Sequence, residues 1–292
     1  MRFGCHVSIA GGLYKAIERG VELGCEAIQI FASNPRGWRV SPLRAEDVAR
    51  FKEARADSGI SVVAVHSTYL VNLASPNPEI REKSYSRFRE DLERAGQIGA
   101  EYMIIHPGSH GGAGLETGFD YVAEAFNRFR QESEVKSMAL LEIEAGGGTE
   151  IGGSWDNLCR IRDRIEAAEE WVGLCLDTCH SFAAGYDLRT PEGWRAVLDT
   201  IKERCGLAAL KLIHANDATG ELGDRLDRHS HIGHGRLGLA GFAAMMEQPE
   251  LHGLPVILET PEDELGNFAT NLETLRQLWR TRQKQGNTVN SR

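Results

Sequence analysis

The segment LCLDTCH, residues 174–180, joins two side chains that can bind a metal ion to the end of a short apolar run. The run predicts a buried strand that ends at Asp177, and His180 follows three residues later. A carboxylate and an imidazole at the edge of such a strand suit a divalent ion better than they suit packing. Taken alone, the segment predicts that both bind the same ion. Cys175 and Cys179 could add thiolate ligands, but small apolar core residues are their favoured role.

The same arrangement recurs along the whole chain. Eight short apolar runs have the β-branched and aromatic content of strands, at residues 2–7, 27–31, 62–66, 102–106, 139–143, 172–177, 210–214 and 255–259. All but the second, which ends at Phe31, finish at or beside a side chain that can bind metal: His6, His66, His106, Glu142, Asp177, His214 and Glu259. Nine of the ten histidines lie at these ends or in the segments that follow them. Histidines that served packing alone would not gather in this way.

Longer amphipathic segments separate these runs, and several end in a glycine suited to a helix C-terminus, at Gly24, Gly59 and Gly99. Eight strands that alternate with helices predict an α/β protein, a single parallel (β/α)8 TIM barrel. An open doubly wound sheet is the alternative, but no G-x-G-x-x-G motif follows the first strand. No linker rich in Pro, Gly or Ser divides the chain, so residues 1–283 are expected to form one domain, followed by an irregular tail at 284–292.

A parallel barrel would bring the strand ends together, because their C-terminal ends share one face, where TIM-barrel active sites lie. A single histidine at a strand end is more often structural than a metal ligand. The convergent set differs, since carboxylates such as Glu142, Asp177 and Glu259 would be costly to bury there without cations. The segment DRHSHIGHG adds Asp227 and His229, whose spacing in an extended loop places both side chains on one side.

Composition limits the function classes only weakly. The net charge of −9 argues against a basic nucleic-acid-binding protein, although three divalent ions would contribute +6 and leave −3, so a nucleic-acid substrate stays open.

The six cysteines form no C-x-x-C pair and are expected to be reduced, mostly buried thiols. No apolar run reaches the roughly 18 residues of a membrane span and the N-terminus has no signal pattern, so a cytoplasmic protein without membrane contact is expected.

These motifs together resemble the endonuclease IV family (AP endonuclease family 2), zinc-dependent endonucleases that act at apurinic/apyrimidinic sites. The resemblance spans nearly the whole chain in order: HVSIAGG, SNPRGWR, VHSTYLVNLASP, IIHPGSH, the Glu142 strand with its AGGGT loop, LCLDTCHSFAAGYDL, IHANDA, DRHSHIG and ILETP. It implies three Zn²⁺ ions per chain, held by His66, His106 and Glu142; by Glu142 as a bridge with Asp177, His214 and Glu259; and by His180, Asp227 and His229. Asp177 and His180 would then bind different ions, and the turn between them would set the spacing of the sites.

The implied activity is that of deoxyribonuclease IV, a DNA-repair endonuclease that hydrolyses the phosphodiester 5′ of an abasic site in duplex DNA. It would leave a 3′-hydroxyl and a 5′-deoxyribose phosphate, act on blocked 3′ ends as well, and work as a monomer. The expected mechanism is a trinuclear zinc hydroxide mechanism in which Glu142, the catalytic residue, orients the attacking water. Zinc is favoured over magnesium because five of the nine implied ligands are imidazoles.

DNA recognition is expected to come from loops on the same face. The resemblance implies that Arg36, Tyr69 and Leu70 wedge into the base stack and help to expel the abasic nucleotide. Trp38 is expected to pack within its loop. Phosphates or carboxylates near the third metal are the expected partners of Arg225, Arg228 and Arg236.

Some residues depart from the family pattern or leave alternatives open. That pattern places Asn and a small hydroxyl residue after the bridging glutamate, where Ile143 and Glu144 stand here. His234 falls at a variable position, and His6 and His110 could support a ligand or be structural. Two other functions remain: a metal-dependent sugar isomerase or epimerase on the same barrel, and a non-catalytic module that binds damaged DNA. Metal content separates the first, since roughly three ions per chain favour the nuclease and one or two the isomerase.

Overall fold

The computed structural model describes the backbone of residues 1–289 and the side chains of residues 1–284. Eight parallel strands form a closed barrel in the order β1-β10-β7-β6-β5-β4-β3-β2. These strands are β1 (Arg2–His6), β2 (Ala27–Ile30), β3 (Val62–His66), β4 (Tyr102–Ile105), β5 (Met138–Glu142), β6 (Val172–Asp177), β7 (Leu210–His214) and β10 (Pro255–Leu258). Each overlaps one of the eight predicted apolar runs, and the predicted TIM barrel is confirmed.

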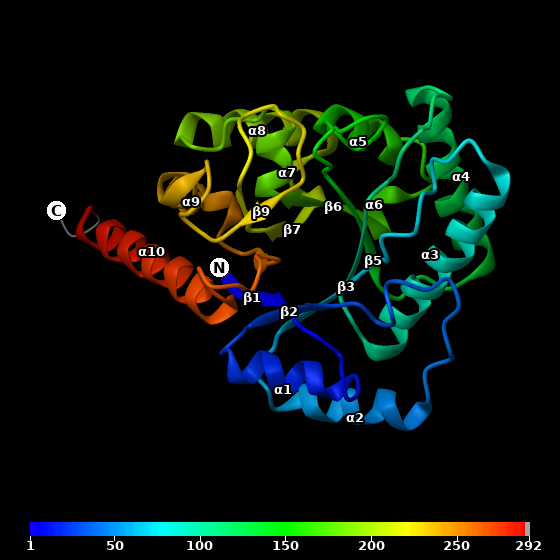
Figure 1. Ribbon diagram of the computed structural model, residues 1–292, viewed down its shortest axis with the longest axis horizontal. Coiled ribbons are helices and arrows are strands. Elements are labelled where there is room, and N and C mark those ends of the chain that lie inside the picture. The colour runs from blue at the N-terminus through cyan, green and yellow to red at the C-terminus, as the bar shows by residue number, and fades with distance from the viewer. Residues whose placement is uncertain (290–292) are drawn as a thin grey trace.

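Helices surround the barrel and separate its strands (Figure 1). They are α1 (Tyr14–Glu22), α2 (Ala45–Ala56), α3 (Pro78–Ile98), α4 (Leu115–Glu132), α5 (Trp155–Arg162), α6 (Ala168–Trp171), α7 (Thr178–Ala183), α8 (Pro191–Cys205), α9 (Gly238–Met246) and α10 (Phe268–Val289), with 3-10 turns η1 (Leu207–Ala209) and η2 (Pro249–Leu251). A two-stranded antiparallel sheet, β8 (Asp217–Ala218) and β9 (His229–Ser230), follows β7.

Local sequence signals set the helix ends. The Asn77 side chain accepts hydrogen bonds from the first N–H groups of α3, and Pro78 occupies the first helical position, where its missing N–H costs nothing. All three predicted C-terminal glycines have positive φ, and Gly24 and Gly99 stand at the ends of α1 and α3, which confirms their role. Gly59 lies two residues beyond the C-cap of α2, which is Asp57.

Two apolar layers hold the barrel. The inner layer fills the space enclosed by the strands and consists of Ala27, Val62, Ala64, Ile104, Leu140, Cys175, Leu212 and Ile257. The outer layer packs the barrel against the helices and includes the large buried rings of Phe3, Phe88 and Trp155. Because side chains fill the barrel interior, chemistry is confined to its ends.

The register between β6 and β7 shifts by one residue. Leu174 pairs with Leu210, whereas the next residue, Cys175, pairs with Leu212. An irregularity of this kind re-aims the side chains that follow it. Here it leaves Asp177 paired with His214 at the ends of the two strands.

One prediction about the cysteines is wrong. Cys159 in α5 and Cys205 in α8 form a disulfide, with Cα atoms 5.7 Å apart, so they are not reduced thiols. The packing of α5 against α8 joins residues that are 46 positions apart, which no local spacing motif predicts. The other four cysteines are free and buried, as predicted: Cys5, Cys25, Cys175 and Cys179.

The C-terminal helix α10 continues to Val289, past the start of the tail predicted for residues 284–292. Residues 290–292 of that segment lie outside the described residues. Within residues 1–289, no helix combines the length and the apolar content needed to cross a membrane.

The close approach of β1 and β2 gives a test of the fold. A Cβ atom added to Gly4 would lie 1.6 Å from the carbonyl oxygen of Ala27. Gly4→Ala should therefore push the strands apart and lower the free energy of unfolding by about 1–3 kcal/mol in urea denaturation. Gly253→Ala is the matched control, because a Cβ atom there meets nothing within 4 Å. Equal unfolding midpoints for the two variants would contradict this strand packing.

Candidate metal centre

The mouth of the barrel collects all nine predicted ligands from elements far apart in the sequence. Six stand at or directly after the ends of β3, β4, β5, β6, β7 and β10: His66, His106, Glu142, Asp177, His214 and Glu259. The other three come from α7, from the segment between β8 and β9, and from β9 itself: His180, Asp227 and His229. Parallel strands thus place their C-terminal residues on one face, as the barrel topology requires.

Glu142 lies at the centre of the mouth, and its side chain is fully buried. Its Oε2 atom lies 3.1 Å from His66 Nε2 and 3.0 Å from His106 Nε2. Its Oε1 atom lies 2.7 Å from His214 Nδ1. The two oxygens therefore face different imidazoles, an arrangement suited to a carboxylate that bridges two ions.

Two groups of potential ligands share Glu142. The members of each can place one ligand atom within 4.8 Å of one another: His66, His106 and Glu142 in the first group, and Glu142, Asp177, His214 and Glu259 in the second. The first group is rich in imidazole and the second in carboxylate. Both are compact enough to hold a divalent ion.

A third group lies beside the other two and contains His180, Asp227 and His229. Asp227 Oδ1 lies 3.0 Å from His180 Nε2 and 3.3 Å from His229 Nε2. This group is the most open of the three, since the side chain of Asp227 is 53% exposed. Of the arginines expected near it, Arg236 pairs with a carboxylate, that of Glu221, at 2.9 Å.

Main-chain carbonyl groups orient three of the imidazoles. The Nδ1 atom lies 2.7 Å from a carbonyl oxygen in His66, 2.9 Å in His180 and 3.1 Å in His229. A donated Nδ1–H leaves Nε2 to face the ligand groups, and metal-binding histidines are commonly held in this way. The donor set therefore fits divalent ions, and its high imidazole content fits zinc.

The imidazoles and carboxylates of the mouth balance one another's charge. Burial alone would raise the pKa of Glu142, but His214 and His106 hold it well below its usual range. The pKa of Glu259 is likewise lowered, against the effect of burial, chiefly by His214. Burial opposes charge on His106, yet Glu142 raises its pKa to about 9. The imidazoles and carboxylates of the mouth thus favour one another's charged forms.

The two thiols near these groups are poor competitors for metal. Cys175 can approach Glu142 and His214, and Cys179 can approach Asp177 and His229. Burial raises the pKa of Cys175 to about 12 and also raises that of Cys179. Because the thiolate is the form that binds metal, these values favour the apolar role predicted for both residues.

The residues that depart from the family pattern are accommodated next to Glu142. Ile143 is buried in the outer apolar layer, and its carbonyl oxygen faces His180. Glu144 is buried as well, accepts a hydrogen bond from the Gly152 N–H at 2.8 Å, and lines a cavity of 370 Å³ beside the first ligand group. Burial raises the pKa of Glu144 to about 7, so it adds less than a full negative charge near neutral pH.

The remaining histidines separate into supporting and structural roles. His6 Nδ1 lies 3.4 Å from Glu259 Oε1, which places His6 behind a predicted ligand. His110 accepts hydrogen bonds from the N–H groups of Gly112 and Gly114 and so shapes its own loop. His234 is exposed, and its ring lies 6.3 Å from that of His231.

Sequence reasoning missed two amides that hold the predicted ligands. Asn216 donates to Asp177 Oδ2 at 2.7 Å and accepts from the Glu259 N–H at 2.8 Å. Gln29, on β2, contacts His214 and Glu259. Amides are not typical metal ligands, so a search for ligand types passes over them. The sequence offered one signal for each amide. Gln29 is a polar residue inside the apolar run AIQIF, and Asn216 lies two positions after His214.

The predicted DNA-contacting residues lie on loops at the mouth. Tyr69 is 75% exposed, packs its ring against Phe31, and lines both of the adjoining 370 Å³ cavities. Arg36 is exposed and Leu70 is partly buried. Trp38, expected to pack, is 39% exposed and lies in the segment 31–44 between β2 and α2.

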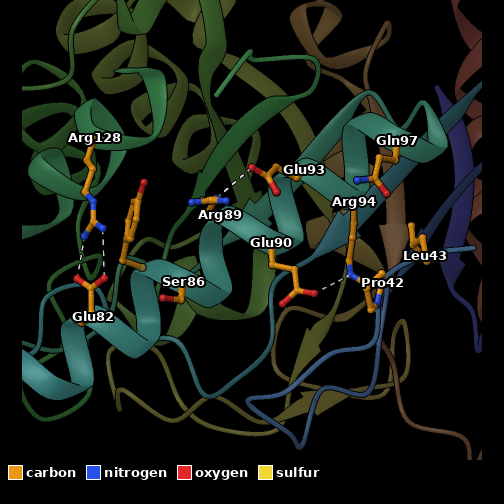
Figure 2. A pocket seen from close by; sticks show the side chains of 11 residues that line it. Pro42, Leu43, Glu82, Ser86, Arg89, Glu90, Glu93, Arg94, Gln97 and Arg128 are labelled. Atoms are coloured by element: carbon orange, nitrogen blue, oxygen red, sulfur yellow. Dashed lines mark hydrogen bonds and ion pairs between the residues drawn. The ribbon is translucent and has the colours of Figure 1, made fainter. Parts of the chain in front are cut away.

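A larger cavity, of 520 Å³, lies on the outer wall beside α3 (Figure 2). Three arginines line it, and each pairs with a glutamate: Arg89 with Glu93, Arg94 with Glu90, and Arg128 with Glu82. These pairs neutralise the positive charge that would be needed to bind a nucleic-acid backbone. The mouth of the barrel is therefore the stronger candidate for chemistry.

A closed parallel barrel with three adjoining groups of imidazole and carboxylate ligands at its mouth defines a metal-dependent TIM-barrel enzyme. Residues 17–280 match the family described as Xylose isomerase-like TIM barrel. The probable endonuclease 4 of Methanoculleus marisnigri is 46% identical over 276 residues, which cover 94% of this chain and 98% of the relative. The crystal structure of endonuclease IV from Thermus thermophilus aligns with a TM-score of 0.85 at 35% identity, over 96% of this chain and 100% of that one. The chain belongs to the endonuclease IV family and is a metal-dependent DNA-repair endonuclease.

The sugar-epimerase alternative shares only the fold. A D-tagatose 3-epimerase-like protein aligns with a TM-score of 0.73 over 98% of this chain, but at 19% identity. That level of identity reports a common barrel and says nothing of a shared substrate.

Metal binding should depend on pH, because the imidazoles must lose their protons first. His106, with a pKa of about 9, is protonated through the neutral range, so zinc affinity should rise from about pH 6 to about pH 9 and zinc binding should release protons. Calorimetry in buffers of different ionisation enthalpy measures that release. His252→Ala, outside the mouth, should leave the profile unchanged. Zinc affinity that is constant over this range would show that the charge balance is wrongly assigned.

Proposed function

We propose that the protein hydrolyses the phosphodiester 5′ of an abasic site in duplex DNA, leaving a 3′-hydroxyl and a 5′-deoxyribose phosphate. The position of Glu142 carries the proposal, because its two oxygens face separate ligand groups at the mouth of an endonuclease IV barrel. Removal of blocking groups from 3′ ends is proposed as a second activity, since it needs the same attack on a phosphate ester.

Three zinc ions per chain would occupy the three ligand groups. The first is held by His66, His106 and Glu142, the second by Glu142, Asp177, His214 and Glu259, and the third by His180, Asp227 and His229. When bound, such ions make water a stronger nucleophile near neutral pH and offset the charge of phosphoryl oxygens. The formal charge of three dications would also offset two thirds of the net charge of −9.

The protein's own groups orient the reaction. The Glu142 carboxylate, whose two oxygens face the nitrogens of His66 and His214, would orient the attacking water and take up its proton. Asn216 fixes Asp177 and the main chain at Glu259, so that the second ligand group keeps its shape while charge develops on the phosphate.

Recognition of the abasic site is assigned to the loops after β2 and β3. Tyr69, Leu70 and Arg36 would enter the base stack, where an apolar or aromatic wedge favours extrusion of a nucleotide that has lost its base. The exposure of Tyr69 and Arg36 supports this assignment. The missing base lowers the cost of unstacking, which accounts for selection of damaged over intact DNA.

An incision assay on a duplex with one abasic site tests the proposal. Wild-type protein loaded with zinc should cut 5′ of the lesion, whereas Glu142→Gln should retain most of its zinc and cut about 10²- to 10⁴-fold more slowly. Glu150→Gln removes a carboxylate that lines the same mouth but belongs to none of the three ligand groups, and should cut at close to the wild-type rate. Normal turnover by Glu142→Gln, or the absence of incision by the wild type, would refute the proposed function.

The role of Tyr69 predicts a change in DNA binding without a change in metal content. Tyr69→Ala should weaken binding to abasic DNA by about 10- to 100-fold, as expected from the loss of one base-stacking contact. Fluorescence anisotropy with labelled duplexes measures the affinity. Tyr121→Ala, whose ring packs under Arg81 on the outer wall, is the control. Equal affinities for the two variants would remove Tyr69 from the recognition surface.

A further inference from the structure

Gln29 is a fully buried amide on β2, between two fully buried isoleucines, Ile28 and Ile30. Alternation along the strand turns its side chain to the opposite face from these neighbours. A buried amide is costly unless its oxygen and its two N–H groups all find partners. The partners of Gln29 lie in the mouth of the barrel.

The Gln29 amide contacts three residues of the mouth at once. Its Oε1 atom lies 2.7 Å from His214 Nε2. Its Nε2 atom donates to Glu259 Oε1 and also lies 3.0 Å from His6 Nδ1. One side chain from β2 thus connects residues at the ends of β1, β7 and β10.

The Glu259 carboxylate fixes which way the amide points. Carboxylate oxygens only accept hydrogen bonds, so the NH₂ group of Gln29 must face Glu259. The reverse orientation would set the amide oxygen against the carboxylate. The amide oxygen therefore faces His214, and because it too can only accept, His214 Nε2 must carry a hydrogen.

A hydrogen on Nε2 leaves Nδ1 as the nitrogen that can bind an ion. His214 Nδ1 faces the second ligand group, 2.7 Å from Glu142 Oε1 and 3.4 Å from Glu259 Oε2. His66 and His180 present the opposite nitrogen, since their Nδ1 atoms face main-chain carbonyls. For His214, the acceptor on the far side of the ring is the side chain of Gln29. Unlike a main-chain carbonyl, this acceptor can be changed by substitution.

We propose that Gln29 is the positioning residue of the second metal site: one amide selects the Nδ1-binding form of His214 and holds Glu259 beside it. The inference rests on the proposed function in that it takes the second ligand group to bind zinc. It does not depend on DNA or on cleavage.

Gln29→Met tests the inference, because methionine is of similar length but offers no comparable acceptor or donor. In competition with a chelator, this variant should release one of its zinc ions about 10- to 100-fold more readily than the wild type. In ¹⁵N–¹H imidazole spectra of the zinc-loaded protein, the Nε2–H signal of His214 should lose its hydrogen-bonded shift. Gln29→Glu keeps an oxygen opposite Nε2 in either protonation state, and should therefore keep that shift.

Ile28→Val controls for packing, since it shortens a buried side chain of the same strand that faces the other way. It should keep the wild-type zinc release and the wild-type His214 signal. The inference is overturned if Gln29→Met retains both properties, or if Ile28→Val loses zinc to the same extent. Incision of abasic DNA by the wild type tests the proposed function separately, so failure of one proposal is distinguishable from failure of the other.

Discussion

The buried carboxylate of Glu142 is the constraint on which the rest of the mouth depends. A carboxylate removed from water is stable only when opposite charges and hydrogen bonds surround it, and its two oxygens lie within 3.1 Å of nitrogens of His66, His106 and His214. Positive charge on the surrounding groups balances that of the carboxylate, either as protons on the imidazoles or as metal ions bound between the ligands. The strands organise these groups.

The barrel supplies this organisation through strand register. Strands β6 and β7 pair Asp177 with His214 beyond the shift at Leu174, so two ligands of one group stand side by side on rigid backbone. Two members of the third group, Asp227 and His229, come from a longer segment after β8. Side-chain hydrogen bonds, rather than strand register, hold this part of the chain. The buried carboxylate of Asp217 accepts hydrogen bonds from main-chain N–H groups that follow β9, including that of Gly233. Loop and barrel ligands therefore reach the same mouth by separate means.

The positions of the candidate ligands can be predicted from sequence because a parallel barrel brings the residues at its strand ends to one face. Apolar runs of strand length, each followed by His, Asp or Glu, must converge once the strands are parallel and closed. The supporting contacts carry no such pattern. Gln29 meets His214 across 185 positions, and the Cys159–Cys205 disulfide depends on how two helices pack. Each is a pairwise contact between distant segments, which neither periodicity nor motif spacing encodes.

We propose that Glu142 bridges two of three metal ions in one mouth. A crystal structure of the zinc-loaded protein, with anomalous diffraction measured on both sides of the zinc absorption edge, would locate each ion. We expect three anomalous peaks, one in each ligand group, with the two oxygens of Glu142 in contact with different peaks. One or two peaks, or both oxygens on the same ion, would contradict the claim.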